Sequence, residues 1–269
     1  DLEKNLENKS DDVLVLDAGN FFQGHPLSII DSGKTMIEWM NKIKYDALVP
    51  GKDDFIFGYK NLINLSKIAD FPIVASNIIY EANKEYVFDP YTIIDVKEVK
   101  VGIIGIVNSK MKEYVLHRDL DGISFIPEIE TMNSWIPKLN EMNADIIIVL
   151  SSLGIPYDRE IVYSEFIDSL KSNNYNINEE DMNSLMLGYY ANGADIIVSG
   201  GENKGYSTPW YDMNTHAYIF QNFAGSEFGH FLMKYDQNNH LFLGYEHAVV
   251  GKIGQTLLLD DFKFDEEQY

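Results

Sequence analysis

VGIIGIV at residues 101–107 and DIIIVL at residues 145–150 are the two stretches of sequence that decide the fold. Both are rich in β-branched side chains and almost free of charge, which is typical of strands buried on both faces of a parallel sheet. Residues 134–142 between them have the pattern of a helix, and DIIVS at residues 195–199 repeats the strand pattern. This alternation predicts an α/β layered fold with helices outside the sheet.

The amino-terminal part of the chain continues the same alternation. Residues 34–44 predict an amphipathic helix, because Met36, Ile37, Met40 and Ile43 recur at helical spacing and would pack into the core. We expect a second helix at residues 60–69 and three short strands, at residues 13–17, 47–49 and 72–78.

The pattern of apolar and polar residues changes from residue 217 onward. AYIFQNF (217–223), FGHFLMKYD (228–236) and HLFLGYE (240–246) alternate apolar and polar residues and predict a three-stranded antiparallel meander. The polar residues 172–181 predict a surface loop or insertion. No internal repeat is visible, so residues 1–269 are interpreted as a single domain.

Charge and composition limit the partners. The chain carries a net charge of −21, which disfavours binding to nucleic acid or to an anionic membrane surface. It contains no cysteine, which excludes disulfides, thiolate metal sites and thiol nucleophiles. No apolar run reaches the length of about 18 residues that a membrane span needs, and the first residues do not resemble a signal peptide.

Functional residues of layered α/β folds lie on loops at the carboxyl ends of the strands. Five glycine-containing or polar loops follow predicted strands, at residues 18–24, 51–58, 107–110, 151–154 and 199–205. They predict one site built from several loops.

The loop segments carry a family resemblance. LDAGNFFQGHPLS (16–28) is similar to the Leu-Asp-Ala-Gly-Asp-x-x-x-Gly-x-x-x-Ser segment of the 5′-nucleotidase and 2′,3′-cyclic-nucleotide phosphodiesterase family, and residues 35–58 resemble the stretch that ends in its Gly-Asn-His-Glu-Phe-Asp motif. Later segments follow in the family's order, so the resemblance spans about residues 12–245. It implies the calcineurin-like metallophosphoesterase fold, a four-layer α/β sandwich of two mixed sheets flanked by helices.

The resemblance also implies where a two-metal phosphoesterase site would lie, and this sequence departs from it throughout. Asn20 stands for the bridging Asp, Lys52 for the metal-binding Asn, Asp53 for the His that stabilises the leaving group, Ile56 for the Asp that orients it, and Ser152 for a ligand His. Gly201 and Asn203 belong to the segment that matches the late Gly-His-x-His motif, which has no His here.

These replacements predict loss of the two-metal centre. Asn20 and Ser152 are neutral, and the Lys52 ammonium beside a cation would cost several kcal/mol. We therefore expect no metal cofactor and an ion pair between Lys52 and Asp53 or Asp54. The alternative is a rebuilt site for one or two divalent ions, with Asp53, Asp54 and Glu202 as ligands.

Asp17, at the end of the first predicted strand, and His25, just after the first loop, are further possible contacts for a ligand. Asp17 is interpreted as structural, and His25 is a candidate contact because it follows Gly24 in the loop. The other histidines, at positions 117, 216, 230, 240 and 247, do not match a ligand position of the family or a helical metal motif.

The ends of the chain differ from the pattern of the family. The family's first strand, with its Asp-x-His motif, has no counterpart here, so it is predicted to be missing or to come from another chain segment. No room is expected for a carboxyl-terminal nucleotide-binding domain. The aromatic segments 188–190 and 206–211 are candidate contacts for a protein partner or assembly.

The sequence supports two hypotheses of function. The first is a non-catalytic 5′-nucleotidase-like protein that acts by binding or as a structural component. The second is a metal-dependent phosphoesterase that hydrolyses nucleotides with an altered or partly externally supplied site. Analogy with the family favours an extracellular, periplasmic or cell-surface location.

Overall fold

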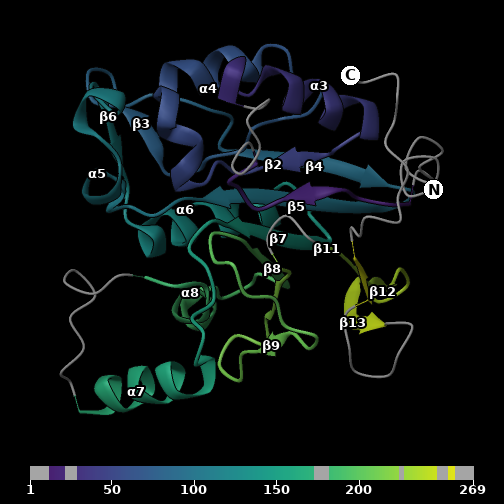
Figure 1. The fold of residues 1–269 in the computed structure, drawn as a ribbon. Helices are drawn as coiled ribbons and strands as arrows, with labels where there is room; N and C mark the ends of the chain where they lie inside the picture. The colour runs from purple at the N-terminus through teal and green to yellow at the C-terminus, as the bar shows by residue number, and fades with distance from the viewer. Residues whose placement is uncertain (1–11, 22–28, 173–181, 224–226, 247–253, 258–269) are drawn as a thin grey trace.

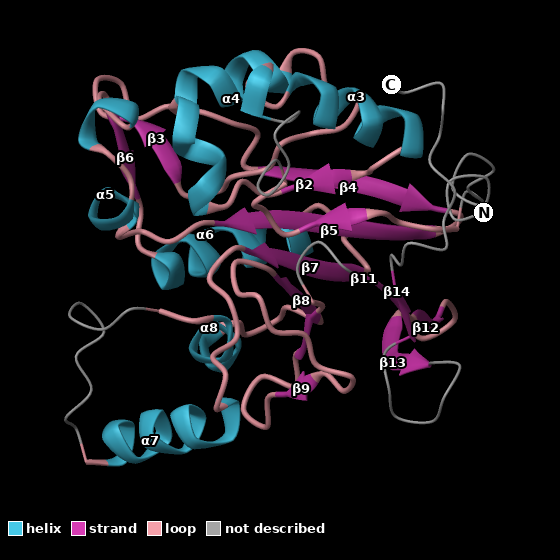
Figure 2. Cartoon of the chain, viewed as in Figure 1, coloured by secondary structure: helices cyan, strands magenta, loops and turns pink. Residues whose placement is uncertain are grey.

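A computed structural model describes residues 12–21, 29–172, 182–223, 227–246 and 254–257. The centre of the fold is a six-stranded mixed sheet with the order β4-β5-β7-β8-β10-β9 (Figure 2). The inner strands β5, β7, β8 and β10 are parallel, and the edge strands β4 and β9 are antiparallel to their neighbours. Their bounds are β4 Tyr91–Val96, β5 Val99–Ile106, β7 Ile146–Ser151, β8 Ile196–Ser199, β9 Trp210–Tyr211 and β10 Tyr218–Gln221.

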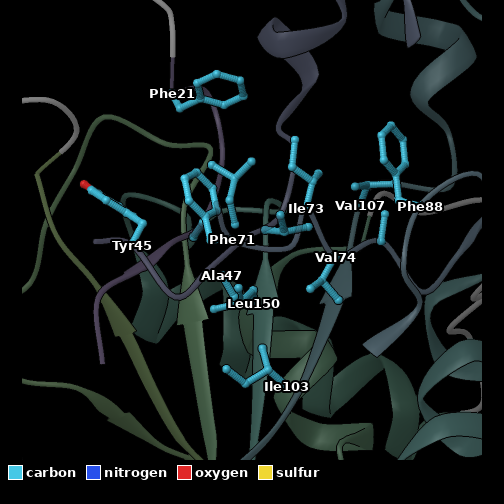
Figure 3. Packing of buried hydrophobic residues seen from close by; sticks show 14 of the residues in the cluster. Phe21, Tyr45, Ala47, Phe71, Ile73, Val74, Phe88, Ile103, Val107 and Leu150 are labelled. Carbon is cyan, nitrogen blue, oxygen red and sulfur yellow. The ribbon is translucent and has the colours of Figure 1, made fainter. Parts of the chain in front are cut away.

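The inner strands are buried on both faces, as their uncharged sequences predict. Ile103 of β5 and Ile148 of β7 belong to one apolar cluster. Their neighbours Ile104 and Ile147 belong to a second cluster on the other face of the sheet. Figure 3 shows part of the first cluster, in which Ile103 and Leu150 of the sheet lie close to residues of the amino-terminal layers. Successive side chains of a strand point to opposite faces, so a run without polar residues requires cover on both sides.

A second, smaller sheet and two helices cover the first face. β1 (Leu16–Asp17) and β2 (Ala47–Leu48) pair in parallel, and single bridges join Leu48 to Ile73 and Val74 to Asp89. Helices α3 (Lys34–Ile43) and α4 (Tyr59–Ser66) lie outside this sheet in Figure 1. The predicted apolar stripe of α3 is confirmed, since Ile37, Met40 and Ile43 are buried and Met36 packs at the edge of the cluster.

Helices α6 (Glu128–Glu141) and α8 (Ser184–Tyr190) cover the second face, and α7 (Arg159–Lys171) packs against α8. The result is two sheets stacked between helices, which confirms the predicted four-layer α/β architecture. The shorter elements are η1 Lys52–Phe57, β3 Ile78–Tyr80, α5 Met111–Tyr114, η2 His117–Asp119, β6 Ile123–Phe125, β11 Glu227–His230, β12 Leu232–Asp236, β13 Leu241–Glu246 and β14 Gly254–Leu257.

The predicted meander is wrong in its first strand, and its second strand, residues 228–236, is divided into β11, which pairs with β14, and β12. β10 joins the main sheet in parallel with β8, while β12 and β13 form the predicted hairpin by themselves. Residues 72–78 are not a continuous strand, because only Ile73 and Val74 make single bridges before β3 begins at Ile78. The edge strand β4 was not predicted, and of the predicted polar loop only Ser172 lies within the described residues. None of the helices in the described ranges combines the length and apolar character that a bilayer crossing requires.

Candidate functional site

The loops that follow β1, β2, β7 and β8 meet at the carboxyl ends of these strands. A Cβ atom on Gly200 would lie 2.5 Å from the carbonyl oxygen of Ala18, and one on Gly201 would lie 2.5 Å from that of Ser152. Glycine is therefore required at both positions for the loop after β8 to approach its two neighbours. Gly51 of the loop after β2 packs against Asn20 in the same way, so four of the five predicted loops converge, whereas the fifth, at residues 107–110, is bonded through Ser109 to Glu128 of α6.

Asn20 and Asp54 join the loop after β1 to helix η1. The Oδ2 atom of Asp54 accepts hydrogen bonds from the backbone N–H groups of Asn20 and Gly51, both at 2.7 Å. The Oδ1 atom of Asn20 in turn accepts the backbone N–H of Asp53 at 3.0 Å. Asp54 is fully buried, and Asn20 has a φ of 65°, a left-handed conformation that asparagine tolerates. These oxygens thus bind peptide groups of the protein itself.

The three other predicted positions on η1 differ in their exposure. Lys52 is exposed, and among the described residues it makes no ion pair with Asp53 or Asp54, so the predicted salt bridge is not formed. Both residues lie in the 3₁₀ helix η1, where Lys52 is exposed and the carboxylate of Asp54 is buried. Asp53 is half-buried, and the side chain of Ile56 is 59% exposed.

The loops after β7 and β8 bring Ser152, Gly201 and Glu202 together. The Ser152 backbone N–H donates to the carbonyl of Ile106 at 3.1 Å, while its buried Oγ atom has no hydrogen-bond partner among the described residues. Glu202 is exposed, and its Cγ atom lies over Gly154, where a Cβ would collide with it. Asn203 is also exposed.

Asp17 stabilises the first loop, as the structural interpretation predicts. Its Oδ1 atom accepts the backbone N–H of Gly19 at 2.8 Å, the Asx pattern that fixes a turn. Burial raises the pKa of the Asp17 carboxyl to about 6, and the Gly19 hydrogen bond partly opposes this rise. His25 lies outside the described residues.

A buried hydrogen-bonded chain behind the loops was not predicted from the sequence. Ser151, Ser184, Ser199 and Gln221, here called the serine relay, join the ends of β7, β8 and β10 to the start of α8. Ser184 Oγ lies 2.9 Å from Ser151 Oγ and 2.8 Å from Ser199 Oγ, and Ser199 Oγ donates to Gln221 Oε1 at 2.8 Å. The four residues are far apart in sequence and follow no motif, so no local signal identifies them.

The residues at this site do not fit a pair of divalent cations. The Oδ1 atom of Asn20 and the Oδ2 atom of Asp54 already accept backbone N–H groups, Lys52 on η1 carries a positive charge, and Ser152 offers one neutral hydroxyl. Within the described ranges, no three His, Cys, Asp or Glu side chains gather in a way that could hold a metal, and this applies to Asp53, Asp54 and Glu202. A two-metal centre needs several anionic or imidazole ligands around each ion.

The sequence of this chain is similar to the sequences of known phosphoesterases. The chain is 33% identical over 164 residues to a snake venom 5′-nucleotidase of Crotalus adamanteus, covering 59% of this chain and 27% of the relative. It is 34% identical over 175 residues to the trifunctional nucleotide phosphoesterase protein YfkN of Bacillus subtilis, covering 57% of this chain and 12% of that protein. No protein-family model matches the chain.

The solved structures extend the likeness to nearly the whole chain. A 5′-nucleotidase precursor of Thermus thermophilus has a TM-score of 0.73 at 21% identity, covering 95% of this chain and 47% of its own. The calcineurin-like phosphoesterase YfkN of Bacillus subtilis has a TM-score of 0.70 at 23% identity, covering 99% and 83%.

The fold therefore places this chain among proteins of the metallophosphoesterase fold. More narrowly, its homologues are 5′-nucleotidases and the related phosphoesterase YfkN, which confirms the resemblance found in the sequence. The chain spans 27% and 12% of the length of the two relatives matched by sequence.

Proposed function

We propose that this chain is a non-catalytic relative of the 5′-nucleotidases that acts by binding or as a structural component. The observation that carries the proposal is the pairing of Asn20 and Asp54 with backbone N–H groups of the adjoining loops. By resemblance, Asn20 stands where an active relative has the carboxylate that bridges two metals. Here it is a neutral amide whose oxygen is already bonded.

The energetics of the site support the same proposal. A cation near Asn20 would compete with the N–H groups that Asp54 and Asn20 accept, and breaking bonds to a buried carboxylate costs about 1.5–3 kcal/mol each. The side chains of Asn20 and Ser152 offer only neutral amide and hydroxyl oxygens. These are weak replacements for a bridging carboxylate and an imidazole.

The surface beside the site supports a protein partner. Exposed apolar side chains lie at the end of η1 and directly before η2, with Ile56 at 59%, Phe57 at 37% and Leu116 at 62% exposure. The two turns are adjacent, since a Cβ on Gly58 would lie 3.3 Å from the carbonyl of Asp119. Apolar residues that adjoin one another on a surface favour association with another protein. The candidate segment 188–190 differs, because Tyr189 and Tyr190 pack against Phe166 of α7.

An exported location remains part of the proposal. It is supported by the relatives that are snake venom 5′-nucleotidases, among them that of Crotalus adamanteus. Fractionation of the source cells with an antibody against the chain tests it, and recovery with cytosolic markers alone would contradict it.

The test of the main proposal is metal content by elemental analysis of native protein, with nucleotide hydrolysis measured on the same preparation. We expect no stoichiometric divalent metal and no turnover. Turnover that requires added metal and disappears in Asp53→Ala, but persists in the matched exposed-acid variant Asp121→Ala, would overturn the proposal.

The second candidate is a phosphoesterase whose site is completed by another segment, and the outer edge of β1 favours it. The carbonyls of Val15 and Asp17 accept bonds from Asp46 and Val49 on the β2 side, so the peptide groups of Leu16 face the opposite edge. No strand in the described ranges pairs with β1 there. This candidate predicts a co-purifying segment, detectable by mass spectrometry, whose removal abolishes nucleotide hydrolysis.

A further inference from the structure

A hollow lies at the opposite end of the main sheet from the convergent loops. It has a volume of about 270 Å³ and is bounded by the turn before β8, strands β9 and β10 with the turn between them, and strand β13 of the hairpin. Asp195, which lines the hollow, comes directly before the first residue of β8. The loop of the candidate site comes after the last residue of the same strand. The two sites are therefore separate, and a ligand in this hollow is independent of the proposed loss of catalysis.

Aromatic residues form the wall of this hollow. The rings of Tyr211 and Tyr218 have centroids 4.8 Å apart, and the ring of Phe242 stands edge-on to Tyr218 at 6.3 Å. Phe242 belongs to the hairpin and the two tyrosines to the main sheet, so the hairpin completes the wall by packing against the sheet. Tyr211 is 39% exposed, which leaves part of its surface open to solvent.

The turn between β9 and β10 is fixed in an unusual conformation. His216 has a φ of 66°, a left-handed conformation that is uncommon for residues other than glycine. Its Nδ1 atom lies 2.8 Å from the hydroxyl of Tyr211, and the buried carboxylate of Asp212 holds the turn by accepting the N–H groups of Asn214 and Thr215. This network orders the Tyr211 ring at the mouth of the hollow before any ligand arrives.

Asp195 supplies a negative charge without a positive partner. Its Oδ2 atom accepts the backbone N–H of Ile147 at 2.8 Å, and among the described residues no Lys or Arg pairs with it or lines the hollow, while the imidazole of His216, which does line it, bonds to the hydroxyl of Tyr211. Burial raises the pKa of the Asp195 carboxyl to about 6, because the surroundings disfavour its negative charge. A bound cation would compensate that charge.

We propose that this hollow binds a small organic cation of the alkylammonium type, with Asp195 as its counter-ion and Tyr211, Tyr218 and Phe242 as its aromatic wall. Aromatic faces attract ammonium groups through the ring quadrupole, and pockets of this kind recognise quaternary ammonium ions. The volume lies just below the range of about 300–1,000 Å³ that is typical for drug-sized ligands, so a compact ion fits it better than a nucleotide.

The proposal is tested by ligand-detected NMR titration of the full chain with tetramethylammonium and with choline. We expect saturable binding of both cations and much weaker binding of dimethylbutanol, the neutral carbon analogue of choline. Sodium chloride at the same ionic strength controls for attraction to the overall negative charge. Absence of saturable binding, or equal binding of the neutral analogue, would overturn the proposal.

Four variants locate the binding. Asp195→Asn keeps an acceptor for Ile147 and should weaken binding about tenfold, whereas Asp89→Asn removes an equal charge at an exposed position elsewhere and should leave it unchanged. Tyr211→Leu removes a ring and should weaken binding about fivefold, while Tyr211→Phe keeps the ring and should bind nearly as well as wild type. Circular dichroism verifies that each variant is folded. Equal affinity in folded Asp195→Asn and wild type would refute the assignment of the counter-ion.

Discussion

Replacing Ser184 by alanine is expected to destabilise the protein by about 1–2 kcal/mol, although the change removes a single oxygen atom. The reason lies in the direction of the hydrogen bonds in the serine relay. Gln221 Oε1 can only accept, so the Ser199 hydroxyl donates to it. Ser184 must then donate to Ser199, and Ser151 must donate to Ser184.

The orientation of the Gln221 amide, on which this direction depends, is set by two further contacts. Its Oε1 atom accepts the backbone N–H of Ile155 at 2.7 Å, and its Nε2 atom donates to the carbonyl of Lys204 at 2.6 Å. Exchanging the two atoms would place donor against donor and acceptor against acceptor. The amide therefore has one consistent orientation.

The magnitude depends on the groups that Ser184→Ala leaves unpaired. Ser151 is fully buried, and its hydroxyl loses its acceptor, which costs about 1–3 kcal/mol for an unpaired buried donor. Ser184 is the first residue of α8, where alanine recovers at most about 0.5 kcal/mol of helix propensity. Ser151→Ala leaves an acceptor site of Ser184 under-used and removes only the long 3.4 Å bond from the backbone N–H of Leu153, so it should cost less than Ser184→Ala.

Urea unfolding followed by circular dichroism measures these differences in the free energy of unfolding. They should appear as shifts of the midpoint urea concentration with an unchanged m-value. The double variant Ser151→Ala/Ser184→Ala should be more stable than the sum of the single effects predicts, by about 1 kcal/mol, because it removes the unpaired donor together with its lost acceptor. Strict additivity, or a larger loss in Ser151→Ala than in Ser184→Ala, would refute the directed relay.

Three further predictions concern the convergent loops. Because the pKa of Asp17 rises from about 4 in the unfolded chain to about 6 in the folded protein, the folded state binds more protons in this window and the free energy of unfolding falls as pH rises through it. In thermal melts, the melting temperature of Asp17→Asn should therefore rise relative to that of wild type as pH increases from 4 to 7. Asp17→Asn should itself keep part of the pH dependence, because the pKa of Asp195 is raised as well. A melting-temperature difference between Asp17→Asn and wild type that does not change with pH would contradict this. Lys52→Ala should change the free energy of unfolding by less than about 0.5 kcal/mol in urea, since the side chain is exposed, and a loss of about 2 kcal/mol would mean that Lys52 is paired after all. Gly51→Ala should destabilise by about 2 kcal/mol or more, because its Cβ would lie 2.6 Å from the backbone nitrogen of Asn20, and a melting temperature equal to wild type would show that the loops can separate without cost.

The sequence alone determined the layered core and the place where the loops meet. The uncharged runs of β5 and β7 could be stable only between two apolar layers, and the stripe of Ile37, Met40 and Ile43 on α3 supplied one of them. Since the carboxyl ends of parallel strands lie at one edge of a sheet, convergence of the loops followed without knowledge of the strand order.

Only the tertiary structure decided which strands pair and which polar groups bond. The alternating pattern of β10 suits a hairpin as well as an inner strand of the main sheet, and its parallel pairing with β8 depends on a partner more than twenty residues away. Ser184, Gln221 and the Asn20–Asp54 contacts likewise join residues far apart in sequence. Sequence periodicity reports which face of an element is buried, whereas a hydrogen bond between distant elements depends on how those elements pack, and that is fixed by the whole chain.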